Sequence, residues 1–188
     1  YVEAMGGLWC TALGWGEEEL VQAAMEQMRN LSFSHIFGGK SHEPAIALAE
    51  KLKEMAPFPV GKVFFANSGS EANDSQIKLM WYAANSRGQK GRKKIIARNK
   101  AYHGVTLASA SLTGLDAFHK SFDLPFDFTV RVSEAHYYRG ARDGETEEQY
   151  SQRLADELDV TIQREGPDTI AAMFMEAVMG AGGAMLPP

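Results

Sequence analysis

Cysteine and positive charge are both scarce in this sequence. Cys10 is the one cysteine among 188 residues, which excludes an internal disulfide. Lys and Arg number 19 against 24 Asp and Glu, giving a net charge of -5. This balance disfavours nucleic acid and anionic membrane surfaces as main partners, and no apolar run approaches the length that spans a bilayer. We therefore expect a cytoplasmic protein without a nucleic-acid or membrane partner.

What is present is ordinary for a globular protein. The hydrophobic share is 45% and the charged share 23%, and the chain is long enough to bury a sizeable core. The sequence starts at Tyr1 without an initiator Met and ends in a glycine-rich stretch before Pro187 and Pro188. We expect a segment of a longer polypeptide.

The hydrophobic period changes abruptly within residues 62–87. Val63, Phe64 and Phe65 form a compact β-rich run, so residues 62–66 are predicted to be a buried strand. From Ala72 onward the apolar residues recur at helical spacing, which predicts a helix. The small polar residues 67–71 join the two elements.

This junction has the composition of an anion-binding turn. Gly69 gives the backbone room to turn, while Ser68 and Ser70 place hydroxyls beside the unpaired N–H groups of a helix start. Such a start carries roughly half a positive charge and favours a phosphate. Ser68-x-x-Glu71 also matches a capping box, which needs no ligand, so both interpretations stay open.

Further periodic segments surround this junction. A small-residue helix is predicted within residues 104–114 and a loop over residues 119–138. Amphipathic spacing and capping residues predict helices, and short apolar runs predict strands. The helices cover residues 17–28, 43–55 and 146–165, and the strands cover residues 93–98 and 169–176.

The alternation of helices and strands predicts an α/β fold with a mainly parallel sheet and flanking helices. Ligands of such sheets bind at the carboxyl ends of the strands. Three predicted strands end there at polar residues: the anion-binding turn, Tyr102 with His103, and Glu176. We expect one pocket to collect all three groups.

Two other kinds of site are not supported. The run of Gly39, Lys40 and Ser41 resembles the end of a P-loop, but the glycine required five residues earlier is replaced by Ser34. His42 and His103 lack metal-ligand spacing to other ligand residues, so no metal site is predicted.

The predicted pocket combines an aromatic ring, a phosphate-binding turn and an acid. A flat, phosphorylated heteroaromatic cofactor requires these groups, because its phosphate anchors it, its ring stacks, and its ring nitrogen works best beside negative charge. Pyridoxal 5'-phosphate (PLP) fits this description.

Six motifs make the sequence resemble the class III pyridoxal-phosphate aminotransferases, most closely the omega-amino-acid and amine:pyruvate branch. They are GLWC at residues 7–10, the aromatic loop with His42 and Pro44, FANSGSEAN at 65–73, AYHG at 101–104, GPDTIAA at 166–172 and MGAGG at 179–183. The resemblance runs over essentially the whole chain.

The resemblance implies a fold-type I large domain, incomplete in this chain. Residues 1–40 would be an N-terminal segment with active-site and dimer-contact loops, and residues 41–188 the first part of the PLP-binding large domain. It also implies a homodimer with shared sites.

Roles for individual residues follow from the resemblance by position. Gly69 and Ser70, with Ser68 alongside, are implied to hold the cofactor phosphate. Tyr102 is implied to stack on the ring with His103 in the same wall, and Glu176 is similar to the acid near the ring.

Trp9 and Phe37 resemble residues that line the substrate pocket, Phe37 across the dimer interface. Core or interface packing is the alternative for both.

The implied activity is transfer of an amino group from an omega-amino acid or amine to a keto acid such as pyruvate. Alternatives are an acetylornithine or 4-aminobutyrate-type transaminase using 2-oxoglutarate, a decarboxylation or racemisation on the same cofactor, and a catalytically incomplete phosphate-binding or dimerisation scaffold. Activity assays with panels of amino donors and keto acids separate these enzymatic alternatives.

The sequence departs from the family pattern at two places. Ala177 follows Glu176 where the family usually has Pro, so the turn there is expected to differ. The resemblance implies that the Schiff-base lysine and the Asp that pairs with the ring nitrogen lie beyond Pro188, and Lys100 is expected in an exposed ion pair. We therefore expect no catalytic residue in this chain, and no activity from it alone.

Overall fold

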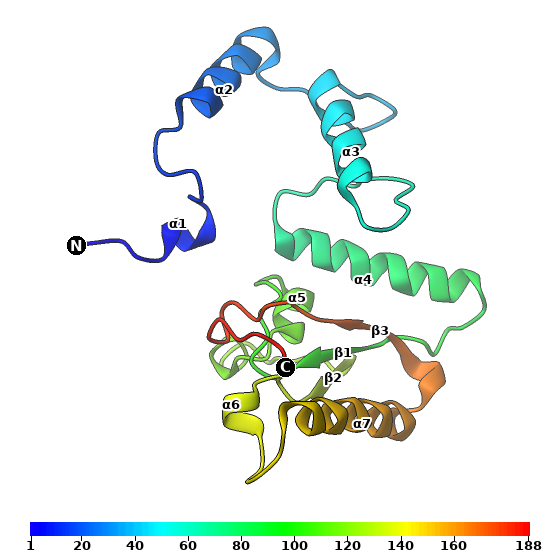
Figure 1. Cartoon of the computed structure of the whole chain (residues 1–188). Coiled ribbons are helices and arrows are strands. Elements are labelled where there is room, and N and C mark those ends of the chain that lie inside the picture. Colours follow the sequence, from blue (N-terminus) through cyan, green and yellow to red (C-terminus); the bar gives the residue numbers. More distant parts are fainter. The chain divides into compact units, whose positions relative to one another are not determined.

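The computed structural model describes residues 1–188 and divides into two compact units, Tyr1–Phe64 and Phe65–Pro188 (Figure 1). Each unit is described by itself. The boundary predicted after residue 40 concerned the domains of the whole protein and stays a prediction. No helix in either unit combines the length and the apolar character needed to cross a membrane.

The first unit is made of helices. α1 (Gly6–Trp9) is a single turn with left-handed dihedrals at Gly7 and Leu8, followed by α2 (Glu18–Leu31) and α3 (Glu43–Met55). The predicted helices over residues 17–28 and 43–55 are thus confirmed. The His42 ring caps α3 by accepting a 3.3 Å hydrogen bond from the Ala45 N–H. No residue of this unit is buried.

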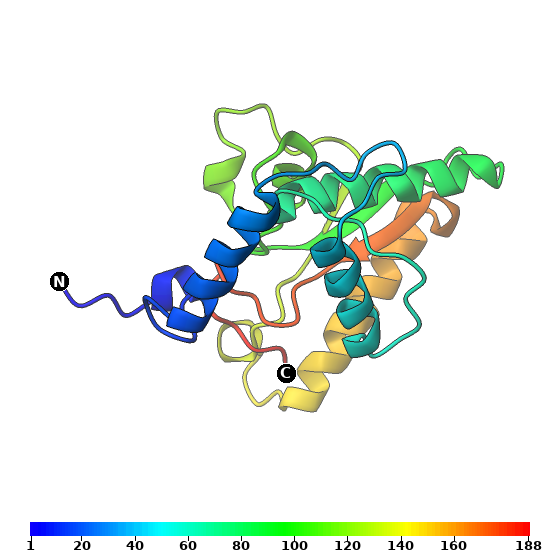
Figure 2. The same ribbon diagram turned by 90° about the horizontal axis from the view of Figure 1, so that it is seen from above.

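The second unit contains a three-stranded parallel sheet in the order β2-β1-β3. Its strands are β1 (Lys94–Arg98), β2 (Thr129–Val132) and β3 (Ile170–Phe174). Helices α4 (Gly69–Ser86) and α5 (Leu107–Leu112) cover one face and α7 (Glu147–Glu165) covers the other, as Figure 1 shows from the side and Figure 2 from above. The predicted α/β class with a parallel sheet is confirmed. The short elements are η1 (Asp116–Phe118), α6 (Tyr137–Gly140) and η2 (Pro167–Thr169).

The core of this unit lies on both faces of the central strand. Ile95 and Ala97 pack with Ile77 and Leu112 on the side of α4 and α5. Ile96, between them in sequence, points to the α7 side, because successive side chains of a strand alternate between faces. A strand buried on both faces requires the continuous apolar run found here.

The predicted strand over residues 62–66 is wrong. These residues form no regular element, and the Phe64 side chain is 74% exposed. A strand exists only where a neighbour supplies the partners for its backbone, and none of the three strands pairs with this segment. An apolar run of β-favouring residues indicates a propensity for strand formation, but it does not provide the neighbouring strand that the backbone needs.

The predicted loop over residues 119–138 is wrong in part, because it contains β2 and α6. β2 has four residues, of which Val130 and Val132 alone face the core. Two inward side chains are too few to establish an alternating pattern in the sequence. β2 forms because its backbone pairs with β1, and this pairing cannot be read from the local sequence.

Candidate functional site

The start of α4 is fixed by hydrogen bonds within the chain. Ser68 is the N-cap, and its Oγ accepts from the Glu71 N–H at 3.1 Å. The Glu71 carboxylate turns back to accept from the Asn67 N–H at 3.0 Å, one residue before the position that a capping box uses. The capping interpretation is therefore realised in part, yet the Ser68 hydroxyl keeps its proton to donate.

Two backbone donors at this start remain open. The N–H groups of Gly69 and Ser70 have no acceptor within the chain, as expected for the first turn of a helix. A Cβ built on Gly69 would meet no atom within 4 Å, so a ligand has free access to the backbone there. These donors and the helix dipole together favour an anion.

The segment after His103 is brought into contact with this helix start. The Val105 N–H donates to Ser70 Oγ at 3.1 Å, which leaves the Ser70 hydroxyl proton free. Gly104 has φ of +129°, and a Cβ there would lie 2.5 Å from Ser70 Oγ and 3.0 Å from Ser70 Cα. Only glycine permits this approach.

Asp74 joins α4 to α5 beside the same helix start. Its Oδ1 lies 2.8 Å from both Thr106 Oγ1 and Ser109 Oγ and accepts from the Ser109 N–H at 3.1 Å. Ser109 Oγ is also 2.9 Å from the Ser70 carbonyl oxygen. The carboxylate thus caps α5 and places it against the turn. Sequence reasoning missed Asp74, Thr106 and Ser109, because small polar residues in helices give no distinctive pattern.

Tyr102 carries a partly exposed ring and precedes by three residues Val105, whose N–H contacts Ser70. The residue is 37% exposed, and its ring packs edge-on to Phe118 with centroids 5.7 Å apart. Its N–H donates to Glu176 Oε1 at 2.9 Å. The ring is therefore available for stacking while its backbone is held.

His103 is enclosed by protein. It is 8% exposed, its N–H donates to Thr113 Oγ1 at 2.9 Å, and its carbonyl accepts from Asn73 Nδ2 at 2.7 Å. Burial holds the pKa of His103 below its ordinary value, so the ring is neutral at pH 7. The ring Nε2 is buried without a partner, and the ring packs edge-on to Phe174.

Glu176 links three segments at the carboxyl end of the sheet. Its Oε1 accepts from the Tyr102 N–H, its Oε2 accepts from the Gly180 N–H at 3.0 Å, and its carbonyl accepts from Arg98 Nη2 at 2.9 Å. Ala177, where the family usually has Pro, leaves these contacts intact. The structure therefore gathers the turn at Ser70, the Tyr102–His103 segment and Glu176 into one network.

Trp9 and Phe37 belong to the first unit and are 65% and 83% exposed, and their roles in substrate binding stay predictions. Lys100 forms an ion pair with Glu134, with Nζ and Oε1 2.6 Å apart, as expected. Lys100 therefore contributes no free amine to the site.

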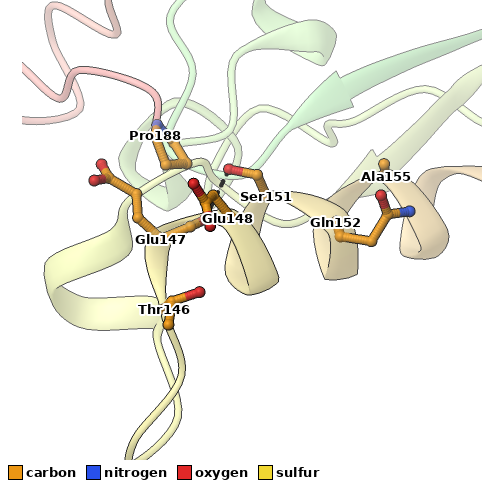
Figure 3. Close-up of a pocket in the computed structure, with 7 residues that line it drawn as sticks. All are labelled: Thr146, Glu147, Glu148, Ser151, Gln152, Ala155 and Pro188. Atoms are coloured by element: carbon orange, nitrogen blue, oxygen red, sulfur yellow. Dashed lines mark hydrogen bonds between the residues drawn. The ribbon is translucent and has the colours of Figure 1, made fainter.

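Two hollows of the second unit include none of the residues predicted to bind the cofactor among their lining residues. One lies at the start of α7 and is drawn in Figure 3; it is lined by Thr146, Glu147, Glu148, Ser151, Gln152, Ala155 and Pro188. The α7 start is already occupied by its own acids and by a capping box of Thr146 and Gln149, so it offers no anion site.

The second hollow is an apolar groove of about 460 Å³ between α7 and the sheet. Leu154, Leu158, Met173 and Met175 supply much of its wall. None of the residues predicted to bind a cofactor lines it.

The residues at the start of α4 fit a phosphorylated aromatic group. Two backbone N–H groups and the hydroxyls of Ser68 and Ser70 supply donors for a phosphate, and open space lies beside Gly69. Tyr102 supplies an aromatic ring, with its backbone fixed by Glu176. The arrangement thus supplies both kinds of contact that such a group needs.

Comparison with protein families gives one match over the whole chain. The family model described as "Aminotransferase class-III" matches residues 1–188. Among curated proteins, the chain is 52% identical to "Gamma-aminobutyrate transaminase 1, mitochondrial" of Oryza sativa subsp. japonica, covering 100% of this chain and 37% of the relative. It is 50% identical to "Gamma aminobutyrate transaminase 3, chloroplastic" of Solanum lycopersicum, covering 100% and 36%.

Solved structures share the fold. A "Transaminase with L-ala" superposes with a TM-score of 0.97 at 55% identity, covering 100% of this chain and 44% of that chain. An omega transaminase from Pseudomonas jessenii in complex with PMP superposes with a TM-score of 0.97 at 53% identity, covering 100% and 42%. The chain thus spans well under half the length of the relatives it matches.

Proposed function

Because this chain belongs to the class III aminotransferase family, we propose that the whole protein is a PLP-dependent transaminase. The proposed reaction moves an amino group from an omega-amino acid or amine to a keto acid such as pyruvate. The observation that carries the proposal is the start of α4, where open N–H groups at Gly69 and Ser70 adjoin the ring-bearing Tyr102 segment.

The residues of this chain would bind and orient the cofactor. Ser68, Gly69 and Ser70 would donate hydrogen bonds to the phosphate, and such charge-assisted bonds are about twice as strong as neutral ones. Tyr102 would stack on the ring, a contact worth about 1 kcal/mol. When bound, PLP supplies the electron sink that transamination requires.

The names of the relatives support an omega-amino donor. The curated relatives are named as transaminases of gamma-aminobutyrate, which is an omega-amino acid, and a solved relative is named an omega transaminase. Another solved relative was determined with L-alanine, the amino form of pyruvate, which supports pyruvate as acceptor.

A 4-aminobutyrate-type transaminase that uses 2-oxoglutarate is the second candidate, favoured by the names of the curated relatives. The two candidates share the donor and differ in the acceptor. Assaying the whole protein with 4-aminobutyrate and either pyruvate or 2-oxoglutarate decides between them, and faster turnover with 2-oxoglutarate would favour the second.

The lysine that carries the reacting amine is proposed to lie outside residues 1–188. Transamination needs such a group as nucleophile and proton carrier, and Lys100 is held by Glu134. Borohydride reduction of the PLP-loaded whole protein, followed by peptide mapping, should label a lysine beyond Pro188. An adduct on Lys100 would contradict this assignment.

We further propose a homodimer located in the cytoplasm. α2 exposes Leu20, Val21 and Met28 and α3 exposes Leu48 and Leu52, and apolar faces of this kind mark protein interfaces. Sedimentation of the whole protein tests the dimer, and cell fractionation tests the location.

A pair of glycine-site measurements tests the cofactor proposal. The variant Gly69→Ala should fold normally, because its Cβ meets no protein atom, but should bind PLP at least about tenfold more weakly by crowding the phosphate. Gly91→Ala is the matched control, since Gly91 lies beyond the other end of α4 with equally open space and, like Gly69, has no positive φ. Failure of the unmodified whole protein to bind PLP would favour the scaffold alternative.

A further inference from the structure

We propose that Glu176 is a positioning residue, whose carboxylate fixes the Tyr102 ring for stacking by holding two backbone N–H groups. The resemblance to the family implies an acid near the cofactor ring, whereas both carboxylate oxygens here are held by backbone N–H groups. The inference rests on the proposed cofactor and assigns Glu176 a different role in binding it.

Both carboxylate oxygens of Glu176 are engaged. Oε1 accepts from the Tyr102 N–H at 2.9 Å and Oε2 accepts from the Gly180 N–H at 3.0 Å. A carboxylate that accepts from two backbone donors is oriented by them, and hydrogen bonds to a charged group are worth more than neutral ones.

The bond to Glu176 is the one hydrogen bond that holds Tyr102 itself. The Tyr102 carbonyl and phenol make no hydrogen bond within the chain, and the ring is partly exposed. Because the direction of a side chain follows from its backbone, the ring position depends on this contact together with the edge-on packing against Phe118.

The other end of the segment is fixed independently. Thr113 and Asn73 hold the backbone of His103, and Ser70 holds the Val105 N–H. None of these bonds involves Glu176. Loss of the Glu176 carboxylate should therefore release Tyr102 while leaving the phosphate-binding turn in place.

Glu176 lies three residues before a hairpin that is closed by Met179 and Met185. Met179 and Met185 exchange backbone hydrogen bonds of 3.0 Å in both directions and are buried with Ala101. A Cβ at Gly182 would lie 2.5 Å from the Lys100 carbonyl oxygen, so the hairpin packs tightly beneath the residues that precede Tyr102. The carboxylate thus ties two neighbouring segments together.

Glu176→Gln removes this double contact with little change in size. A carboxamide offers one acceptor oxygen and presents its NH₂ group to the second N–H, so one of the two backbone donors loses its partner. Glu157→Gln is the matched control, because Glu157 also accepts from a backbone N–H, that of Ser133 at 3.1 Å, outside the cofactor network.

The experiment measures binding to the apo form of the whole protein. For Glu176→Gln we expect affinity for pyridoxamine phosphate to fall about five- to tenfold, the size of a lost stacking contact, and affinity for inorganic phosphate to stay within about twofold. Hydrogen exchange at the Tyr102 and Gly180 amides should accelerate, while exchange at His103 and Val105 should not change. Glu157→Gln should alter none of these values.

Other results overturn the inference. Equal weakening of both ligands would mean that Glu176 supports the phosphate-binding turn, and an unchanged affinity for pyridoxamine phosphate would mean that Tyr102 needs no such support. A shift in the absorption maximum of the bound cofactor would instead indicate direct action on its ring.

The proposed function and this inference fail in distinguishable ways. If the unmodified protein bound no pyridoxamine phosphate, the proposed function and the role in cofactor binding would both fall. If it bound normally and Glu176→Gln did not weaken binding, the inference alone would fall.

Should Glu176→Gln not fold, Glu176→Asp replaces it, because Asp keeps both oxygens on a shorter stem. We expect this variant to lose an intermediate amount of affinity for pyridoxamine phosphate, and wild-type affinity would refute the role.

Discussion

The long helices of the two units are equally regular but differ completely in what they bury. α2 and α3 of the first unit contain no buried residue, and their apolar side chains, such as Leu20 and Leu52, are 59% and 42% exposed. In the second unit, α4 and α7 pack on opposite faces of a sheet whose central residues Ile95 and Ile96 are at most 1% exposed. Regular helices thus do not by themselves make a core.

This difference separates what local sequence can specify, a helix, from what it cannot, a core. A helix closes its hydrogen bonds within one segment, so capping and periodicity suffice to predict it. A core requires segments distant in sequence, and the strands of the second unit supply them. The first unit therefore has apolar helix faces that no other segment of the unit buries.

The largest effect that would sharpen this contrast is expected at the central strand. Ile95→Ala should lower the free energy of unfolding by about 2–5 kcal/mol, because it leaves a cavity at a fully buried position. Leu20→Ala, in the first unit, should cost less than about 0.5 kcal/mol in the monomeric chain. Urea denaturation followed by circular dichroism measures both. Equal losses would show that the first unit has a core of its own.

A second contrast concerns side-chain hydrogen bonds between residues distant in sequence, which the second unit has and the first unit lacks. Arg131 donates to the carbonyls of Ser111, Leu112 and Thr113, and burial lowers its pKa to about 10. Arg131→Met should destabilise by about 1–3 kcal/mol, since these carbonyls lose their partner. Arg139→Met removes an exposed guanidinium and should change unfolding by less than about 0.5 kcal/mol in the same denaturation experiment.

The close approach of backbone segments gives a third test. Gly104→Ala should destabilise by about 1–3 kcal/mol, because the new Cβ would clash with Ser70 at a positive φ. Gly38→Ala in the first unit also has a positive φ, but its Cβ would meet nothing within 4 Å. It should cost roughly 1 kcal/mol through strain alone, and thermal unfolding of both variants separates clash from strain.

A fourth test uses pH. The bidentate Arg153 guanidinium, with the Arg142 N–H, lowers the pKa of Glu145 to about 2 from its ordinary 4.5. The unfolded chain therefore takes up this proton first, so the stability that the pair contributes is present above pH 4.5 and is lost as the pH falls toward 2. Unfolding free energies of wild type and Glu145→Gln, measured from pH 5 to pH 2, should converge. Parallel curves would exclude a contribution from this carboxylate.

The smallest effect is expected in the first unit. His42→Ala removes the side-chain cap of α3 and should destabilise that helix by about 0.5 kcal/mol. Hydrogen exchange should accelerate at the first turn of α3 and stay unchanged in β1. A change in β1 would mean that the two units unfold together.

Much of the fold could be predicted from the sequence, and the errors have one cause. The long helices and strands β1 and β3 were predicted because each carries its period within a single segment. The strand over residues 62–66 was predicted from propensity and is not formed, while β2, with two inward valines, was not recognised. In both places the outcome depends on whether another strand lies alongside.

The candidate site divides in the same way. Ser68, Gly69 and Ser70 were found because a helix start with small polar residues has a local signature. Asp74 and Ser109, which lock α5 to that start, have no such signature, and neither do the two backbone donors that orient Glu176.

The sequence by itself determined the long helices, two of the strands, the small polar turn at the start of α4 and the membership of the class III aminotransferases, because each depends on contiguous residues. Only the tertiary structure decided that Tyr102, Gly180 and Glu176 meet, since a hydrogen bond between residues 74 positions apart depends on how the sheet folds the chain back. The physical reason is that backbone periodicity is local, whereas hydrogen-bond partners at the ends of strands are chosen by packing.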